Sequence, residues 1–440
     1  MSVDATAPTS TTRSSRTPRT PRSPRRTATF TASSSSETST SNPTSGPSTS
    51  GTSVSSRTSL SSLRVSLPEN PHIYDYSELC SATNNFLAKN YTSTASTRCW
   101  RCTLRGKNAI VFQRKFRRKI EMPQLKHLLS VICRCHNRSI VKLLGASVSG
   151  EHIFLVYDFV EGANLANCLR NPKNPKFTVL STWMSRMQIA TDFAQGLDYI
   201  HNQTGIAMTL VHNHIKSSSI IVTEPSFNVK ICHFGTAQLC GEIEEYDHKK
   251  DRASGSSSRY EGEIEEVSED AKRKSSILKR SDSGKRQFDG VRGYMSPEFQ
   301  WTGIATQKSD VYAFGVVLLE LLSGEEPFKY KYDKGRGDFV RTSVVETARV
   351  AIEGVGNNNS GTDMEGRLRT WVDSKLRDSF PVEVAEKMTR LALDCVHGDP
   401  DVRPDMGRVA GKISKLYLDS KMWSDSVRMP TNISVSLAPR

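Results

Sequence analysis

Residues 211–235 concentrate side chains that could do chemistry, namely His212, His214, Lys216, Cys232 and His233. Imidazole accepts and donates protons near neutral pH, and as a ligand it suits transition metals better than magnesium. The set therefore allows three interpretations. It could transfer a proton, bind a transition metal, or consist of histidines that are hydrogen-bonded within a cleft and respond to pH.

Apolar periodicity predicts the elements that must position this stretch. Residues 140–145 and 153–157 are short apolar runs typical of strands. Apolar residues recur at helical spacing across 125–132 and again across 183–200. Residues 309–320 are apolar on all sides, which predicts a helix that runs through the middle of a domain.

The order and spacing of these segments resemble the protein kinase domain of plant receptor-like kinases and receptor-like cytoplasmic kinases. The resemblance covers roughly residues 72–420. Five motifs carry it: the entry segment, the catalytic and metal-binding loops, the end of the activation segment, the central helix and the closing signature. In that order they occupy residues 74–86, 211–235, 293–298, 309–320 and 395–406.

This resemblance implies an α+β, two-lobed protein kinase-like fold. A small β-rich N-lobe would span about residues 70–157, and a large α-helical C-lobe about residues 162–422. Residues 1–69, rich in Ser, Thr, Pro and Arg, have too few apolar side chains to offset their ordering entropy and are expected to be a disordered tail. Residues 423–440 would form a C-terminal tail, and about 240–290 an insertion in the activation segment.

The resemblance also implies that the catalytic positions are degenerate. His214 stands at the catalytic aspartate, Ser219 at the metal-binding asparagine and His233 at the metal-binding aspartate. Phe112 stands at the lysine that holds the ATP phosphates, and Leu128 at the glutamate that pairs with this lysine. Because Mg²⁺ requires oxygen ligands and imidazole prefers softer metals, a normal magnesium site is not expected.

Two further features of the N-lobe also indicate that groups which bind ATP are missing. Residues 92–97 fall at the loop that would cover the phosphates, and they contain no glycine, although close backbone approach needs residues without Cβ. No Asp or Glu occurs from 122 to 150, so the helix there cannot supply an ion pair in any alignment. A one-residue slip would bring Gln113 to the lysine position, whereas Lys115 would need a bulge to reach it.

The positions that hold the fold together are kept. In the family they pack or hydrogen-bond the loops onto the central helix, and the arginine of the closing signature pairs with the glutamate that ends the activation segment. Lys216 matches the catalytic-loop lysine that contacts the transferring phosphate. The matching structural residues are His212, Phe234, Gly235, Glu298, Asp310 and Arg403.

The insertion changes character along its length. It is acidic at 242–245 and 261–269, then basic and serine-rich at 272–283. Serines after basic residues suit many Ser/Thr kinases as substrates, and a phosphate there would change the local charge. The alternative is a passive surface insertion. The candidate phosphorylation sites are Ser275, Ser276, Ser281 and Ser283.

Composition limits the partners and the cellular location expected for the protein. Part of the +14 formal charge lies in the tail, so the excess on the folded part is modest and no nucleic-acid partner is expected. No segment approaches the roughly 18 apolar residues that span a bilayer. Nine cysteines without a secretory signal point to a reducing compartment. The expected location is cytoplasmic; a peripheral position at the plasma membrane and organelle import by the Arg- and Ser-rich tail are the alternatives.

Cysteine spacing raises one further metal site. Cys99 and Cys102 are three residues apart, and Cys133 and Cys135 are two apart, spacings that allow zinc. Buried thiols are the simpler interpretation. The same holds for His214 and His233, which in this fold would face one cleft, where satisfied or pH-responsive histidines are favoured over a transition-metal site.

The functional expectation is a pseudokinase. It would act as a scaffold or allosteric regulator in receptor-like kinase phosphorylation signalling, with active receptor-like or cytoplasmic protein kinases as partners. No cofactor is expected, and ATP would have to bind without a normal magnesium site. The alternative is an unconventional ATP-dependent Ser/Thr protein kinase that uses Lys216 and displaced basic residues such as Lys115.

Overall fold

The computed structural model describes residues 72–87, 98–171, 180–243, 292–333, 335, 337–354 and 361–428. Several expectations fall outside these residues. They are the tail at 1–69, the glycine-loop position at 92–97, the insertion beyond residue 243, and its candidate serines Ser275, Ser276, Ser281 and Ser283.

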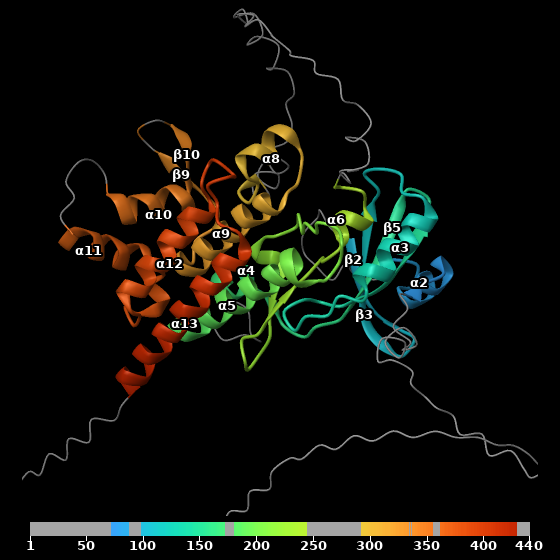
Figure 1. The fold of residues 1–440 in the computed structure, drawn as a ribbon, viewed down its shortest axis with the longest axis horizontal. Helices are drawn as coiled ribbons and strands as arrows, with labels where there is room; N and C mark the ends of the chain where they lie inside the picture. The colour runs from blue at the N-terminus through green and yellow to red at the C-terminus, as the bar shows by residue number, and fades with distance from the viewer. Residues whose placement is uncertain are drawn as a thin grey trace, which may run out of the picture. The chain divides into compact units, whose positions relative to one another are not determined.

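The N-lobe contains five strands: β1 (His72–Ile73), β2 (Arg98–Leu104), β3 (Lys107–Lys115), β4 (Leu143–Ser149) and β5 (His152–Asp158). They form one sheet in the order β1-β4-β5-β3-β2. Figure 1 labels β2, β3 and β5 of this sheet on the right of the view. β1 is parallel to β4, and the other neighbours are antiparallel. In this register Phe112 of β3 lies opposite Cys99 on one side and Leu155 on the other.

Two helices accompany the sheet. α2 (Tyr76–Ala82) buries Leu79, and α3 (Met122–Ile132) starts with a proline in its first turn, where the missing N–H costs no hydrogen bond. The buried residues of α3 are the predicted apolar stripe, Leu125, Leu128, Leu129 and Ile132. These side chains join a core cluster that continues from the N-lobe into the C-lobe.

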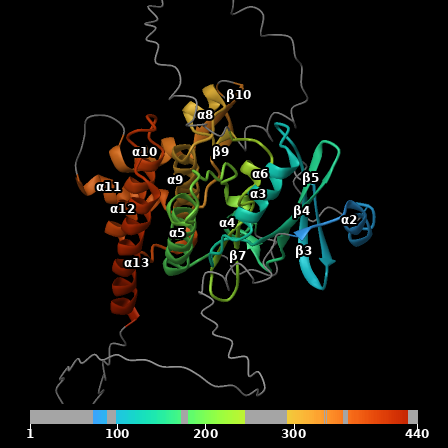
Figure 2. The same ribbon diagram turned by 45° about the vertical axis from the view of Figure 1, so that its right-hand side comes forward.

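The C-lobe is mainly helical, as Figures 1 and 2 show. Its longer elements are α4 (Leu165–Arg170), α5 (Trp183–Asp198), α8 (Pro297–Thr302), α9 (Gln307–Ser323), α10 (Val344–Glu353), α11 (Gly361–Trp371), α12 (Val382–Cys395) and α13 (Met406–Arg428). Its short elements are η1 (Tyr199–Gln203), η2 (Ser217–Ser219), α6 (Thr236–Leu239) and η4 (Ser374–Leu376). The two-lobed α+β fold expected from the sequence is confirmed.

α5 and α9 form the centre of the C-lobe. α9 buries fourteen of its seventeen residues, which explains why its sequence is apolar all round. Thr306 and Ser309 form a capping box at its start, and Gly324 ends it in the left-handed conformation. α5 continues into the π-helical turn η1, so the predicted helix at 183–200 has its expected length.

The remaining strands form two small sheets. β6 (Ala163–Asn164), β7 (Ile220–Val222) and β8 (Val229–Ile231) lie in that order beside the catalytic loop. β9 (Phe328–Asp333) and β10 (Asp338–Ser343) form an antiparallel hairpin between α9 and α10. Residues 140–145 are expected to form one strand, but β4 begins only at Leu143. Ile140 instead forms a bridge to Ile231 and so joins the two lobes.

Two boundaries differ from the expected ones. α13 continues to Arg428, so the expected end of the domain at 422 falls inside a helix, because buried residues such as Ser420 and Ser424 still pack there. The sequence of residues 354–363, rich in Gly and Asn, predicts a flexible loop, but α11 already begins at Gly361. Among the described residues, no helix is both long and apolar enough to cross a membrane.

Arg403 joins the closing signature to the end of the activation segment. Its Nη1 and Nη2 atoms donate to Oε1 and Oε2 of Glu298 at 2.7 Å each, the pair that the resemblance implies. The Arg403 side chain is fully buried and also donates to the carbonyl oxygens of His397 and Lys308. Such an arginine is costly to bury unless every donor is satisfied.

We expect Arg403→Ala to lower the free energy of unfolding by about 3 kcal/mol, because it leaves Glu298 and several carbonyl groups without their donor. Chemical denaturation measures this loss. The control is Arg390→Ala, which removes an exposed pair with Glu386 within α12 and should cost less than about 0.5 kcal/mol. Equal losses in the two variants would contradict a structural role for the buried pair.

Candidate functional site

Asp310 holds the catalytic loop in place from the first turn of α9. Its Oδ2 accepts the backbone N–H of His212 at 2.6 Å, and its Oδ1 accepts that of Asn213 at 2.8 Å. The ring Nε2 of His201 lies 3.0 Å from Oδ2. Asp310 is buried, so these donors replace the water that the carboxylate loses, and they fix Asn213 in a left-handed conformation with φ of 59°.

His212 connects the catalytic loop to the metal-binding loop. Its ring Nε2 donates to the carbonyl oxygen of Cys232 at 2.9 Å, and its Nδ1 accepts the backbone N–H of His214 at 3.2 Å. One donating and one accepting nitrogen describe a neutral imidazole. Burial lowers the pKa of His212 to about 4, against the opposing effect of Asp310. His212 is therefore a structural link and not a proton carrier at neutral pH.

His214, at the position of the catalytic aspartate, meets a carboxylate from the activation segment. Its Nε2 lies 2.9 Å from Oε2 of Glu242, and the side-chain amide of Asn213 donates to the same oxygen at 3.0 Å. Burial would raise the pKa of Glu242, but His214, Asn213 and the charge of Arg114 together lower it. A negative charge thus lies beside the loop although the aspartate itself is missing.

The segment that carries Glu242 is also attached to the N-lobe. The backbone N–H of Arg117 donates to the carbonyl oxygen of Cys240 at 2.8 Å. The guanidinium of Arg118 donates to the carbonyl oxygens of Gly241, at 3.0 Å, and of Ile243. Residues 240–243 therefore connect the catalytic loop to the chain that follows β3.

Phe112 and His233 pack against each other where the phosphate-binding lysine and the metal-binding aspartate would stand. Their ring centroids are 4.6 Å apart at an interplanar angle of 80°, an edge-to-face contact. Burial, followed by the nearby charges of Arg114 and His214, lowers the pKa of His233 well below its ordinary value, so the ring is neutral. Its buried Nδ1 has no hydrogen-bond partner among the described residues.

Ser219, at the position of the metal-binding asparagine, is directed into the protein. It is 1% exposed, and its Oγ has no hydrogen-bond partner within the described part of the chain. Its backbone N–H donates to the carbonyl oxygen of Lys216, and its own carbonyl accepts from Cys232, so the loop geometry is kept. A buried hydroxyl and a neutral imidazole do not fit hard Mg²⁺ ions.

The cations of the site differ from those expected. Lys115, the displaced cation that the alternative of an unconventional kinase requires, does not reach the site, because its Nζ pairs with Glu151 at 2.8 Å on the exposed surface. Side chains alternate along a strand, so Arg114 lies on the same side of β3 as Phe112. The charge of Arg114 lowers the pKa of His233 and, after burial, that of Lys216.

Apolar packing replaces the ion pair that would join α3 to β3. Leu128 is 4% exposed and belongs to the same core cluster as Phe112 and Phe234. Gly235 follows in the left-handed conformation with φ of +81°, and a Cβ atom there would lie 2.5 Å from Cγ2 of Ile132. α3 is therefore seated directly on the metal-binding loop by contacts that need no charge.

The metal interpretations gain no support. Across the described residues, no group of three or more His, Cys, Asp or Glu side chains is arranged to hold a metal ion. Cys102 lies in a different core cluster from Cys99, Cys133 and Cys135. Burial raises the pKa of Cys102 and Cys135 to about 11 and that of Cys133 to about 12, which disfavours the thiolate that zinc requires.

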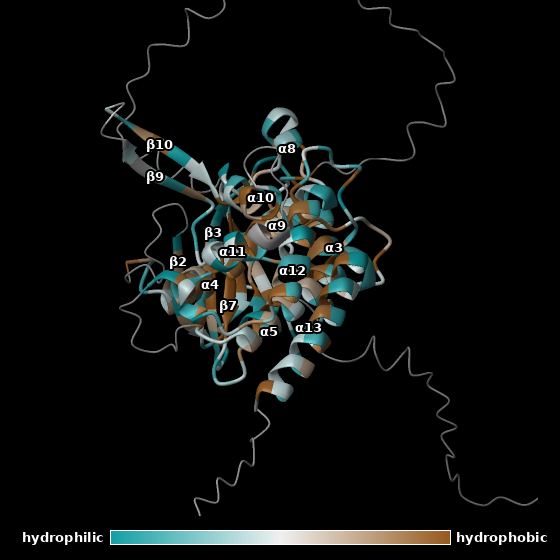
Figure 3. Cartoon of the chain, turned by 90° about the vertical axis from the view of Figure 1, so that its left-hand side faces the viewer, coloured by the Kyte–Doolittle hydropathy of each residue, from teal (hydrophilic) through white to brown (hydrophobic). Residues whose placement is uncertain are grey.

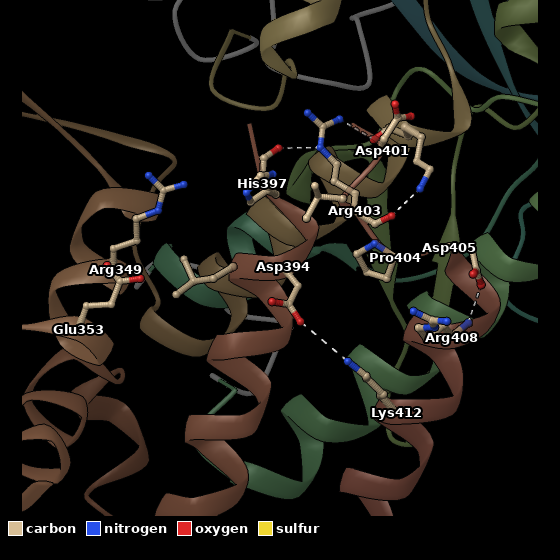
Figure 4. Close-up of a pocket in the computed structure, with 13 residues that line it drawn as sticks. Arg349, Glu353, Asp394, His397, Asp401, Arg403, Pro404, Asp405, Arg408 and Lys412 are labelled. Atoms are coloured by element: carbon tan, nitrogen blue, oxygen red, sulfur yellow. Dashed lines mark hydrogen bonds and ion pairs between the residues drawn. The ribbon is translucent and has the colours of Figure 1, made fainter. Parts of the chain in front are cut away.

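A separate cavity of about 590 Å³ opens in the C-lobe near Arg403 (Figure 4). It lies between α10, α12 and the start of α13, and charges of both signs line it. Several of these groups already have partners: Lys412 lies 3.8 Å from Asp394, and Lys308 donates to the carbonyl oxygen of Arg403. We assign no ligand to this cavity.

The structure brings the rings of Phe112, His214 and His233 together, with centroids 4.6 Å apart for Phe112 and His233 and 6.3 Å apart for His214 and His233, whereas Leu128 and Ser219 are buried in the protein. Sequence reasoning assigned all five to the site. It missed Glu242 and Arg114. The acidic run at 242–245 was visible, but its contact with His214 depends on how the activation segment folds back over 28 residues.

We expect Gly235→Ala to destabilise the protein more than Gly205→Ala, by at least about 1 kcal/mol. Both glycines have positive φ, but a Cβ at Gly205 would meet nothing within 4 Å, whereas one at Gly235 would strike Ile132. Denaturant unfolding of the two variants separates the cost of the clash from that of the backbone conformation. Equal losses would show that α3 moves away without cost.

A pH dependence follows from His212. Its folded-state pKa lies below the ordinary value of 6.5, so the unfolded chain binds more protons between these values and stability is lost as pH falls. From pH 6.5 to 5 the loss from this group is about 1.5 kcal/mol. His212→Gln should remove that part of the pH dependence in denaturant titrations, and an unchanged slope would contradict a buried neutral imidazole.

Comparison with known proteins agrees with this architecture. Residues 100–260 match the family described as protein tyrosine and serine/threonine kinase, and residues 269–412 match the protein kinase domain. LysM domain receptor-like kinase 3 of Arabidopsis thaliana is 30% identical over 81% of this chain and 48% of that protein. Probable serine/threonine-protein kinase PBL28, also from Arabidopsis thaliana, is 26% identical over 76% of each.

A solved structure supports the fold. The pseudokinase domain of BIR2, described as an immune regulator of the RLK/Pelle family, matches with a TM-score of 0.52 and 22% identity over 82% of this chain and 96% of that one. The chain spans about half the length of the receptor kinases that it matches first. The chain belongs to the protein kinase superfamily and is related to the plant receptor-like kinases.

Proposed function

We propose that this protein is a pseudokinase that acts as a scaffold or allosteric regulator in receptor-like kinase signalling. The observation that carries the proposal is the packing of Phe112 on His233, with ring centroids 4.6 Å apart. It puts two neutral rings where an active kinase places a lysine and a metal-binding aspartate. Phosphoryl transfer depends on positioning and on stabilising charge, and these rings supply neither function.

The surrounding residues support the same conclusion. Leu128 fills the place of the helix glutamate with an apolar side chain, and the hydroxyl of Ser219 is directed into the protein. Restoring one charged group would not be enough, since a lysine at position 112 would find no carboxylate on α3 and would be buried unpaired. The charged groups of an active kinase are therefore missing at several positions, and the difference is not a single replaced residue.

A regulator needs a folded surface, and the groups that hold the fold are in place. Asp310 fixes the catalytic loop, His212 joins it to Cys232, and Arg403 secures the end of the activation segment. Because the relatives include receptor-like kinases, we propose active receptor-like or cytoplasmic protein kinases as partners. All nine cysteines are free thiols, which suits the cytoplasm.

One observation favours the alternative, an unconventional Ser/Thr protein kinase. A histidine beside a carboxylate, as His214 lies beside Glu242, is an arrangement found in general bases. Lys216 and Arg114 would then have to hold phosphate groups without a metal ion. This candidate has a base but no ligands that position ATP, and we place it second.

The test is nucleotide binding by the full chain. We expect ATP to give no magnesium-dependent rise in Tm in a thermal shift assay, because the residues at both metal positions do not fit Mg²⁺. We also expect no transfer of labelled phosphate above the level of the His214→Ala variant. An active receptor-like kinase domain in the same assays serves as the positive control.

Two results would contradict the proposal. One is a rise in Tm with ATP that disappears when magnesium is chelated. The other is labelled phosphate on the protein that is lost in His214→Ala, above all on the serines at 275, 276, 281 and 283. Either result would favour the unconventional kinase, in which His214 acts as the base.

A further inference from the structure

The β9–β10 hairpin is largely exposed, and the first four residues of β10 are all exposed. Its two strands pair only with each other within the described sheets, so both outer edges lack a neighbouring strand. Figure 3 shows the hairpin projecting beside α10 from the body of the C-lobe. A two-stranded hairpin alone is marginally stable in water, and an open edge can pair with another extended chain.

One face of the hairpin is aromatic. Tyr332 lies opposite Phe339 in the register, with ring centroids 5.3 Å apart, and Tyr330 lies opposite Arg341. The side chains of Tyr330, Tyr332 and Phe339 are 44, 52 and 54% exposed. Arg341 lies over the ring of Phe328 at 4.5 Å. Three large rings in a row on one face form a docking surface for apolar groups on an extended chain.

The hairpin is also basic. Residues 328–343 contain five Lys or Arg residues and two Asp, a formal charge of +3. The pairing of Lys329 with Glu325 takes up one of these cations. Arg341 is exposed, and no carboxylate within the described residues pairs with it. The occupant of this surface should therefore combine acidic and apolar side chains.

A segment of this chain has that composition. Residues 261–270 contain six Asp or Glu and no Lys or Arg, together with Ile264 and Val267. They belong to the stretch outside the described residues, which ends before Arg292. Gly293 packs on the base of the hairpin, since a Cβ there would lie 2.7 Å from Pro327 and 3.3 Å from Phe328. The chain therefore leaves the insertion beside β9.

The chain between the acidic segment and the hairpin is long enough for the two to meet. Residues 271–291 separate the acidic segment from Arg292, and such a connector reaches at most about 70 Å when extended. A six-residue strand is only about 20 Å long. We propose that residues 261–270 dock as an extended segment on the β9–β10 hairpin of the same chain, with acidic groups on its cations. Because side chains alternate along an extended chain, one of the two apolar residues, Ile264 or Val267, would lie on the aromatic face.

This proposal does not depend on whether the protein transfers phosphate. Strand addition would supply backbone hydrogen bonds to the open edge, and the rings would select the apolar positions. An acidic peptide from another protein or an anionic membrane would use the same charge. If one of these two is the true occupant, it should bind equally well whether or not residues 261–270 are present.

The test compares the full chain with a variant in which residues 260–271 are replaced by a Gly-Ser linker of equal length. The probe is a fluorescein-labelled synthetic peptide of residues 260–271, and fluorescence anisotropy reports its binding. We expect the linker variant to bind the peptide at least tenfold more tightly than the unmodified chain, whose own segment occupies the surface. Raising the salt concentration to 0.5 M should weaken binding at least tenfold.

Charge reversal locates the surface. Arg341→Glu in the linker variant should weaken peptide binding at least tenfold, whereas Lys421→Glu, an exposed change on α13, should leave it unchanged. A peptide with its acidic residues changed to Gln and Asn should not bind. Circular dichroism melting of each variant shows that the fold is retained.

Three outcomes would overturn the proposal. The first is no peptide binding to the linker variant. The second is equal binding to the linker variant and to the unmodified chain, which would assign the surface to a partner protein. The third is Arg341-dependent binding to anionic phosphatidylserine vesicles that is the same in both chains, which would assign it to a membrane.

Discussion

The buried carboxylate of Asp310 is the constraint on which the site depends. It receives the backbone N–H groups of His212 and Asn213 and the ring of His201, and so ties the catalytic loop to the central helix α9. Each of these donors would be unsatisfied if the loop moved away. The loop therefore keeps its conformation whatever residue stands at position 214. The conformation of the loop does not depend on its chemistry, because backbone N–H groups fix the conformation whereas side chains would carry out the chemistry.

Around this fixed loop, packing has taken the place of charge. An active cleft contains a lysine paired with a glutamate, together with two metal ligands that face the nucleotide. Here Phe112, Leu128 and the neutral ring of His233 belong to, or lie against, the continuous core of the two lobes. Apolar contacts stabilise without needing partners of opposite charge, so this N-lobe holds α3 without the lysine–glutamate pair.

The start of the activation segment adds a second kind of stabilisation. Glu242 meets His214 and Asn213 on one side, while Arg118 holds Gly241 and Ile243 on the other. These contacts join the two lobes at the place where the insertion begins.

From the sequence alone, local periodicity predicts α3, α5 and α9, and the resemblance of the motifs to those of protein kinases implies the two-lobed fold and the roles that positions 112, 128, 214, 219 and 233 would have. Tertiary structure decided which charges reach the site. The pleat of β3 turns Lys115 outward and Arg114 inward, and the folded-back activation segment brings Glu242 to His214. The aromatic face of β9–β10 likewise appears only once the register pairs Tyr332 with Phe339. These contacts join residues distant along the chain, and their geometry depends on the packing of whole elements, which local patterns do not specify.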